Sequence, residues 1–311
     1  MREARGAAFW TTGALFAAYV VFLYGPTLTI LALSFQGPQG GLTLPFDGPS
    51  LHWYRALWRG AGLPDVGGAI WNSARLAAVV SVLTTTISVM AGLAFRRGFR
   101  GAGALFYVAV ASLILPSIVV SLGVALEFNL ANKAVSAVGD ALAGRFGEGG
   151  GGPLADALGA AGNWIGDNFQ TLMGLFTSGL GAQLTWTLPF GVLITFAVFN
   201  RFDPSYEEAA RDLGATPWQT FRHVTLPLIA PAVLGIALLG FTLSWDEIAR
   251  SSQAVGSANT LPLTLEGLTT TVTTPVIYAL GTATTAVSLL VIGLALAAFA
   301  LGRRRAGGRA S

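Results

Sequence analysis

Long apolar runs constrain the fold of this chain more than any other feature. The first covers residues 7–34 and exceeds the roughly 20 residues that an α-helix needs to cross about 30 Å of hydrocarbon. It is also longer than the apolar core of a cleaved signal peptide, about 7–15 residues, so we interpret it as a membrane anchor. The full set of runs is 7–34, 69–95, 104–126, 180–199, 226–243 and 276–301. We therefore expect an all-α integral membrane protein, one transmembrane domain over residues 1–311 with six membrane-spanning helices.

The composition favours a bilayer environment over water. Hydrophobic residues make up 53% of the chain and charged residues 11%, which is unlike a soluble domain. There is no cysteine and there are two histidines, so we expect neither a disulfide nor a metal site. The net charge of +3 does not indicate nucleic-acid binding, because the basic residues gather next to the apolar runs.

The distribution of basic residues predicts which side of the membrane each loop faces. Most of the 18 Lys and Arg residues fall in the two terminal tails, the loop at 96–100 and the loop around Glu208. These residues are Arg2, Arg5, Arg96, Arg97, Arg100, Arg201, Arg211, Arg222, Arg303, Arg304, Arg305 and Arg309. Because cytoplasmic segments carry an excess of Lys and Arg, we expect both termini and the loop around Glu208 to be cytoplasmic.

The Gly-rich segment 127–179 is expected on the outer face, where it forms an insert between two spans. Its glycine run, Gly149 to Gly152, is not followed by Gly-Lys-Ser/Thr and so does not indicate a phosphate-binding loop. We interpret it as a flexible linker between two short amphipathic helices. Those helices rest either on the outer membrane surface or on a partner protein, and the sequence leaves both open.

The polar loop 203–225, between the fourth and fifth runs, carries signals for two short helices at an angle. Asp203 is expected to cap the first helix, and Gly214 to end it in a left-handed conformation. Thr216 begins the second helix, with Gln219 completing a capping box. The next span is expected to begin at Pro227.

A spaced motif lies in the same loop. Glu208-Ala209-Ala210 is followed after three residues by Gly214, and after nine more by Val224-Thr225-Leu226-Pro227. This spacing resembles the cytoplasmic coupling motif of ABC-importer permeases, with Val224 in place of the usual Ile. The alternative is a loop whose charges only keep it solvated. We prefer the coupling motif because several fixed spacings coincide with the predicted topology.

The chain resembles binding-protein-dependent ABC permeases of the MetI-like fold from about residue 70 to residue 301. The resemblance implies a multi-pass protein of a prokaryotic plasma (inner) membrane, with no catalytic residue and no bound cofactor. The implied partners are two ATP-binding cassette subunits that use ATP and Mg, a second permease subunit, an extracytoplasmic substrate-binding protein and the lipid bilayer. The implied ATPase-coupling residues are Glu207, Glu208, Ala209, Ala210, Asp212, Gly214, Leu226 and Pro227.

Several segments look more specifically like the PotC-type subunit of spermidine/putrescine importers. They read SLHWYRALW, NSARLA, LPSIVVSLGVAL, EEAARDLGAT and GFTLSWDEI. The resemblance implies a polyamine substrate. The related subgroup also serves phosphonate, ferric-iron and opine substrates, so another small or amino-acid-like solute is the alternative.

A polyamine needs carboxylates or aromatic faces to offset its lost hydration. Trp245, Asp246 and Glu247 follow the fifth run on the outer side, and Glu266 lies in an apolar turn, so we regard these four as candidates for the substrate pathway. The alternative is that they only sit in water at helix ends, which we prefer for Glu127.

Two other functional classes fit the sequence less well. An ATP-independent secondary transporter would use ionisable groups inside the spans, which are few here, and shows inverted repeats, of which none is evident. A membrane-embedded enzyme ranks last, because the runs contain no HExxH, Ser/His or paired-carboxylate arrangement.

Overall fold

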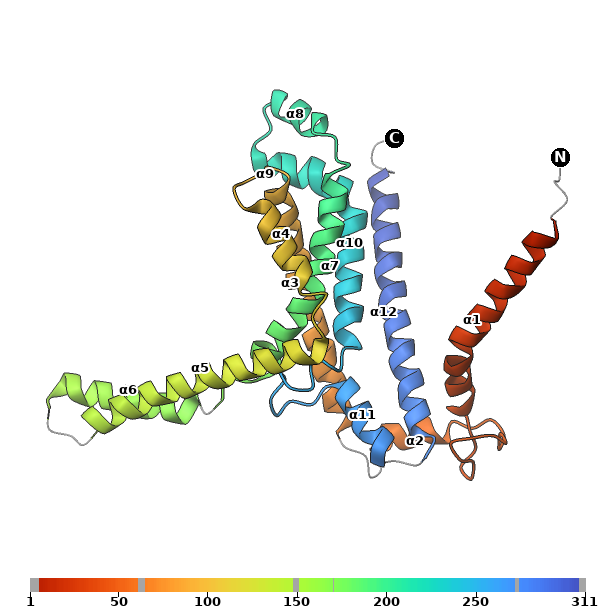
Figure 1. Ribbon diagram of the computed structural model, residues 1–311, viewed down its shortest axis with the longest axis horizontal. Coiled ribbons are helices and arrows are strands. Elements are labelled where there is room, and N and C mark those ends of the chain that lie inside the picture. The colour runs from red at the N-terminus through yellow and green to blue at the C-terminus, as the bar shows by residue number, and fades with distance from the viewer. Residues whose placement is uncertain (1–5, 61–64, 148–150, 170, 272–273, 308–311) are drawn as a thin grey trace. The chain divides into compact units, whose positions relative to one another are not determined.

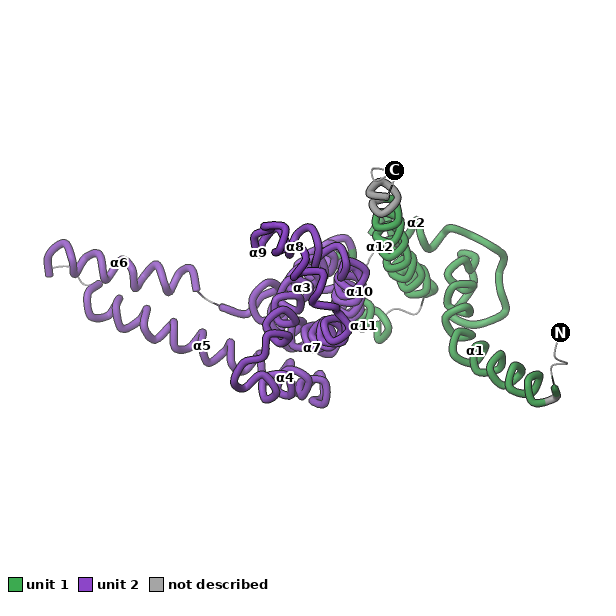
Figure 2. Tube along the Cα trace, turned by 90° about the horizontal axis from the view of Figure 1, so that it is seen from above, with its two compact units in different colours: residues 1–66, 264–311 green, residues 67–263 purple. Residues whose placement is uncertain are grey.

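The computed structural model describes residues 6–60, 65–147, 151–169, 171–271 and 274–307. Within these ranges all regular structure is helical, and six helices are long and apolar enough to cross a membrane. Some residues named above, Arg2, Arg5, Arg309, Gly149 and Gly150, lie outside the described ranges. The chain divides into two compact units, residues 1–66 with 264–311 (unit 1) and residues 67–263 (unit 2) (Figure 2).

Unit 1 contains two long apolar helices, α1 (Ala7–Leu33) and α12 (Val276–Gly307). Late residues of α1, such as Leu31, line a groove together with early residues of α12, such as Gly281. The two helices therefore run antiparallel, and the ends that carry the chain termini lie at the same end of unit 1 (Figure 1). Helix α1 bends in its second half, the half that contains Pro26 (Figure 1).

The loop after α1 is held by aromatic side chains, a type that is enriched at membrane interfaces. Helix α2 (His52–Arg59) turns Tyr54 back, and its hydroxyl bonds the Ser34 hydroxyl at 2.7 Å, while the Trp53 indole donates to the Gly37 carbonyl at 3.3 Å. Only Trp58 stands fully exposed, as an interfacial anchor would.

Unit 2 is built around α3 (Val66–Phe95), with α7 (Leu180–Phe199) and α10 (Leu226–Trp245) packed against it. Small polar residues form the contacts. Thr84 and Thr187 share a hydroxyl hydrogen bond of 2.6 Å, and the Ser81 hydroxyl donates to the Ala237 carbonyl at 2.6 Å. Residues of this size allow helix backbones to approach closely, which is how helices associate where lipid offers no hydrophobic drive.

The stretch expected as a third span, 104–126, is divided at Pro116 into two helices, α4 (Ala102–Ala111) and α5 (Ser117–Phe146). Proline lacks the N–H needed to continue a helix and disfavours helical geometry in the residue before it. In the first turns of α5, Ser117 and Ser121 bond Arg250, which lies in the loop after α10. Helix α5 therefore starts at the end of unit 2 where α3 begins and α10 ends.

The insert forms a helical hairpin of α5 and α6 (Pro153–Asn168), and α5 is far longer than the short helix we expected. Glycines bring the two backbones together. A Cβ at Gly162 would lie 2.4 Å from the Ala143 nitrogen, and a Cβ at Gly139 would lie 2.8 Å from the Ile165 side chain. Both distances are shorter than real Cβ contacts, so the close approach requires glycine at these positions.

Gly162→Ala is expected to separate α5 from α6, because the added methyl group meets backbone atoms that cannot move aside. The penalty for such overpacking is about 1–3 kcal/mol. Amide hydrogen exchange of α6 peptides should accelerate by the corresponding factor. Gly166→Ala is the matched control, since a Cβ there meets open space, and its exchange should stay equal or slow slightly. Equal acceleration in both variants would contradict the packing described here.

Candidate functional site

Loop 203–225 folds locally as its capping signals predict. The Asp203 carboxylate accepts a hydrogen bond from the Ser205 amide at 3.0 Å, just before α8 (Ser205–Asp212). This bond lowers the pKa of Asp203. Gly214 ends the helix with φ +83°, in the left-handed region where a side chain would be strained. Thr216 and Gln219 form the complete capping box of α9 (Pro217–Thr220).

The second helix does not stop before the next span. A π-helical turn, η2 (Phe221–Thr225), joins α9 to α10, so that residues 217–245 form one continuous helix. Pro227 therefore lies inside a helix that began ten residues earlier, instead of marking its start. A continuous helix transmits displacement from the loop into the span, which a flexible hinge would not.

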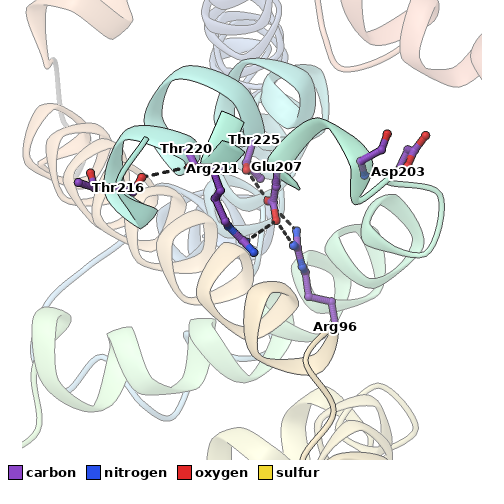
Figure 3. Close-up of polar contacts among 8 residues, drawn as sticks. Arg96, Asp203, Glu207, Arg211, Thr216, Thr220 and Thr225 are labelled. Atoms are coloured by element: carbon purple, nitrogen blue, oxygen red, sulfur yellow. Dashed lines mark hydrogen bonds and ion pairs between the residues drawn. The ribbon is translucent and has the colours of Figure 1, made fainter. Parts of the chain in front are cut away.

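The Glu207 carboxylate is the centre of a hydrogen-bond network at the end of unit 2 that carries loop 203–225 (Figure 3). Arg96, at the end of α3, donates from Nη1 to Oε1 at 3.0 Å and from Nη2 to Oε2. Arg211 donates to Oε2 at 3.4 Å, and the Thr225 hydroxyl donates to Oε1 at 2.5 Å. One carboxylate thus ties α8 to the last turn of α3 and to the turn that leads into α10. We call Glu207, Arg96, Arg211 and Thr225 the Glu207 cluster.

Burial and charge both act on this carboxylate. Glu207 is 6% exposed, and loss of hydration alone would raise its pKa. The hydrogen bonds from Arg96 and Thr225, with the charges of Arg96 and Arg211, outweigh that effect and lower the pKa below its usual value. The Arg96 guanidinium lies 5.4 Å from the ring centres of both Phe199 and Phe202, which keeps it over aromatic faces.

The structure separates Glu207 from the other predicted coupling residues. Glu208, Ala209, Asp212, Gly214 and Pro227 are exposed or partly exposed, and Ala210 and Leu226 are partly buried. The most exposed large apolar side chain of the loop is Leu213, at 90%, and Tyr206 and Trp218 of the same loop are exposed as well. An apolar surface of this kind in a polar loop is typical of a site that another protein covers.

Arg96 and Thr225 are the residues of the Glu207 cluster that sequence reasoning missed. In the sequence, Arg96 indicates only a cytoplasmic loop, and Thr225 is only the residue between Val224 and Leu226 of the motif. The i,i+4 spacing of Glu207 and Arg211 was the one available signal. Nothing in the sequence links Glu207 to residues that lie 111 and 18 positions away.

The candidate pathway residues at the opposite end of unit 2 have different surroundings. Trp245 is buried and stacked on Phe241, with ring centres 5.8 Å apart. Glu247 accepts a hydrogen bond from the Arg250 amide at 3.1 Å. Asp246 is exposed as a residue, although burial of its carboxyl raises the pKa of that group. Taken as whole residues, Asp246 is exposed and Glu247 is partly buried. Glu266 is exposed in α11 (Leu261–Thr271) and belongs to unit 1.

Arg250 is a third residue whose contacts the sequence does not indicate. Its side chain is completely buried. Its guanidinium donates to the hydroxyls of Ser117, at 3.3 Å, and Thr185, and lies 4.9 Å from the Trp186 ring centre. Loss of hydration lowers the pKa of Arg250, and the nearby Glu247 carboxylate opposes this shift. Arg250 therefore joins α5, α7 and the loop after α10.

Within the described residues, no three neighbouring His, Cys, Asp or Glu side chains could hold a metal ion. The side chains described above at the two ends of unit 2 interact through ion pairs and hydrogen bonds. These contacts serve to fix helices relative to one another and to present exposed surfaces.

A family model and two relatives all relate this chain to membrane components of transport systems. The family model described as "Binding-protein-dependent transport system inner membrane component" matches residues 84–305. The putrescine transport system permease protein PotI of Escherichia coli (strain K12) is 30% identical over 243 residues, 78% of this chain and 74% of that protein. The spermidine/putrescine transport system permease protein PotC of Haemophilus influenzae is 28% identical over 288 residues, 92% of this chain and 95% of that protein.

A solved structure is similar as well. The crystal structure of a bacterial ABC transporter involved in the import of the acidic polysaccharide alginate matches with a TM-score of 0.59 and 15% identity. The match covers 95% of this chain and 96% of that chain. At this identity the likeness concerns the fold alone.

Proposed function

The chain belongs to the family of binding-protein-dependent transport system inner membrane components, and we propose that its loop 203–225 receives motion from a partner ATPase. It is a multi-pass inner membrane protein and the permease subunit of an ABC importer. In the proposed complex, two ATP-binding cassette subunits hydrolyse ATP with Mg, a second permease subunit completes the pathway, and a substrate-binding protein delivers the solute. This chain binds no nucleotide in that arrangement.

The Glu207 cluster is the observation that supports the coupling role. Because the carboxylate bonds both Arg96 and Thr225, a displacement of α8 is delivered to α3 and α10 together. Both helices are long enough to cross the membrane. Closure of the ATPase subunits would in this way bias the spans between inward-open and outward-open states.

Leu213→Asp is expected to weaken association with the ATPase at least about tenfold, because it places a charge in an apolar contact. The side chain is 90% exposed, so the stability of the isolated chain should not change. Pull-down of the ATPase by the tagged permease measures the effect. Arg97→Asp, an exposed change at the same end of α3, is the control. Unchanged association of the Leu213 variant would show that the ATPase docks elsewhere.

We propose a polyamine as the substrate. Support comes from the relatives, whose names refer to putrescine and spermidine, and from Asp246, a residue beyond the end of α10 that is exposed although its carboxyl group is partly buried. The positive charge of Arg250 is offset in part by the neighbouring Glu247 carboxylate. A phosphonate, ferric-iron, opine or amino-acid-like solute is the alternative for the same machinery.

Uptake by proteoliposomes that contain the whole complex tests the proposal. We expect labelled putrescine or spermidine to enter only when ATP, Mg and the cognate binding protein are present. Failure of polyamines with success of an anionic solute would reject the substrate and keep the importer. Uptake by vesicles that hold only this chain, without an ATPase, would instead support a secondary transporter.

We also propose that the Glu207 end faces the cytoplasm. Arg96, Arg97 and Arg201 lie at this end, which agrees with the excess of basic residues in cytoplasmic loops. The chain has no cysteine, so single-cysteine variants report on one position each. In intact cells a membrane-impermeant maleimide should label Asn163→Cys and leave Leu213→Cys unlabelled. The reverse pattern would invert the topology.

A further inference from the structure

The α5–α6 hairpin raises the question of what covers it. Helix α5 is apolar enough to count among the six candidate spans, yet only 6% of its most apolar window is buried within the chain. It begins at the end of unit 2 that contains Arg250 and runs sideways from α7 and α10, with α6 returning beside it (Figures 1 and 2). Its apolar surface is therefore not explained by a membrane crossing.

The residues of the hairpin are sorted by helical position. On each helix one side packs against the other helix, as the buried glycines Gly139, Gly159 and Gly162 show. Beside this packed side, one flank of each helix is apolar and the opposite flank is polar. The apolar flanks consist of Leu130, Ala134, Val138 and Ala141 on α5, and Leu154, Ala157, Ala161 and Trp164 on α6. The polar flanks carry Lys133, the partly buried Ser136 and Asp140 on α5, and Asp156, Asn163 and Asp167 on α6.

Both apolar flanks lie on the same broad side of the hairpin. In a right-handed helix, the order of the residues fixes whether a flank lies to the left or to the right of the packed surface when one looks along the chain. The apolar flank lies on the same hand in α5 and in α6. Because the two helices face each other and run in opposite directions, both apolar flanks come to the same side of the hairpin. The hairpin thus has one apolar face and one polar face. With α6 behind α5 in the view of Figure 1, the apolar face is directed toward the end of unit 2 that carries α8. That is the side on which the spans α7 and α10 extend.

We propose that the apolar face of the hairpin rests on the surface of the bilayer, with the polar face in water. Because α5 starts at the end of the spans, its apolar flank is directed to the side on which α7 and α10 extend. Leu154 is 75% exposed and Trp164 is 57% exposed, the types of side chain that interfacial helices insert. Two charges lie on this side of α5, Arg145 at its C-terminal end and Glu127 ten residues after its start. Both residues are exposed, so their side chains can reach water or lipid phosphate.

This inference distinguishes between the two occupants that the sequence left open. A soluble partner would approach from the aqueous side, where the hairpin presents its polar face. With the proposed topology the bilayer surface concerned is that of the outer leaflet. The hairpin then acts as a lateral anchor that keeps Ser117, Ser121 and the loop around Arg250 at a fixed depth.

Spin labels on single cysteines test the inference, because the chain offers a cysteine-free background. Ala161→Cys and Val138→Cys place a label on the apolar face, and Asn163→Cys and Asp140→Cys place one on the polar face of the same helices. All four positions are exposed, so none of the labels needs to displace a packed side chain. The full chain is reconstituted in vesicles of phosphatidylethanolamine and phosphatidylglycerol. Relaxation of each label is measured with oxygen, which enters lipid, and with a water-soluble nickel chelate.

We expect the two agents to relax the labels in opposite order on the two faces. Oxygen should relax the labels at positions 161 and 138 more strongly than the nickel chelate does. The nickel chelate should relax those at positions 163 and 140 more strongly than oxygen does. Strong relaxation by nickel at all four positions would overturn the inference, because the apolar face would then be in water. Shielding of positions 161 and 138 from both agents would also overturn it, since a protein surface would be the occupant.

Discussion

Replacing Glu207 with alanine is expected to lower the free energy of unfolding by about 2–3 kcal/mol and to disconnect ATP hydrolysis from uptake. The change leaves the Arg96 guanidinium without its carboxylate between Phe199 and Phe202, and the buried Thr225 hydroxyl without its acceptor. Breaking a fully buried pair costs about 3–5 kcal/mol, and we lower the value because the Arg96 side chain is 23% exposed. Helix α8 then keeps the surface that we propose for the ATPase but loses its attachment to α3 and α10.

Glu208→Ala is the matched control for this prediction. Glu208 is the exposed neighbour of Glu207, so its replacement should leave stability unchanged and affect only association with the ATPase. Thermal unfolding of the purified chain measures the first effect, and uptake per ATP hydrolysed measures the second. A double-mutant cycle with Arg96→Met isolates the pair. Equal losses of stability in the Glu207 and Glu208 variants would contradict the assigned roles.

The same carboxylate predicts a pH dependence. Its pKa is lowered in the folded protein from the usual 4.5, so ionisation stabilises the fold. This contribution is complete above about pH 4.5 and is lost as the pH falls through the lower folded-state value. A Glu207→Gln variant should therefore lose less stability on acidification than the parent chain, when the two are compared by thermal unfolding.

Arg250→Ala is expected to have the second large effect, a loss of about 3 kcal/mol in the free energy of unfolding. The side chain is completely buried, and its removal opens a cavity beside Trp186 and deprives the Ser117 and Thr185 hydroxyls of their donor. The contacts between α5, α7 and the loop after α10 would then weaken, so we expect uptake to fall as well.

Arg250→Met separates packing from charge. Methionine fills most of the same volume without a buried charge, and replacing buried charges with apolar side chains is often neutral or stabilising. We expect the methionine variant to unfold at or above the temperature of the parent chain, while the alanine variant unfolds well below it. A methionine variant as unstable as the alanine variant would show that the charge itself holds this end together.

The sequence predicts the local structure of this chain well, because apolar length and capping residues act over short distances. Gly214 takes the left-handed conformation and Thr216 forms its capping box, as expected. The sequence does not predict the break at Pro116 as a change of direction, since membrane helices often tolerate proline. The deciding contacts, from Ser117 and Ser121 to Arg250, span 133 and 129 positions of the chain.

The two ends of unit 2 illustrate the same limit for the candidate site. A motif match points to loop 203–225, but it does not distinguish the surroundings of Glu207 from those of Glu208. The fold gives them opposite surroundings, because α8 turns one carboxylate toward Arg96 and the other toward solvent. Likewise, nothing in the sequence distinguishes Arg250 from a solvated loop arginine. Only the packing of α5 and α7 buries it.

A cross-link from Leu213 tests the central claim, that loop 203–225 is the surface through which the ATPase acts on this permease. Leu213→Cys, modified with a benzophenone maleimide in the cysteine-free chain, is assembled into the complete transport complex and irradiated. Leu44→Cys, also exposed but in the loop after α1, is the control. We predict a covalent adduct with the ATPase subunit from position 213 and none from position 44. An assembled, ATP-hydrolysing complex that gives no such adduct from position 213 would contradict the claim.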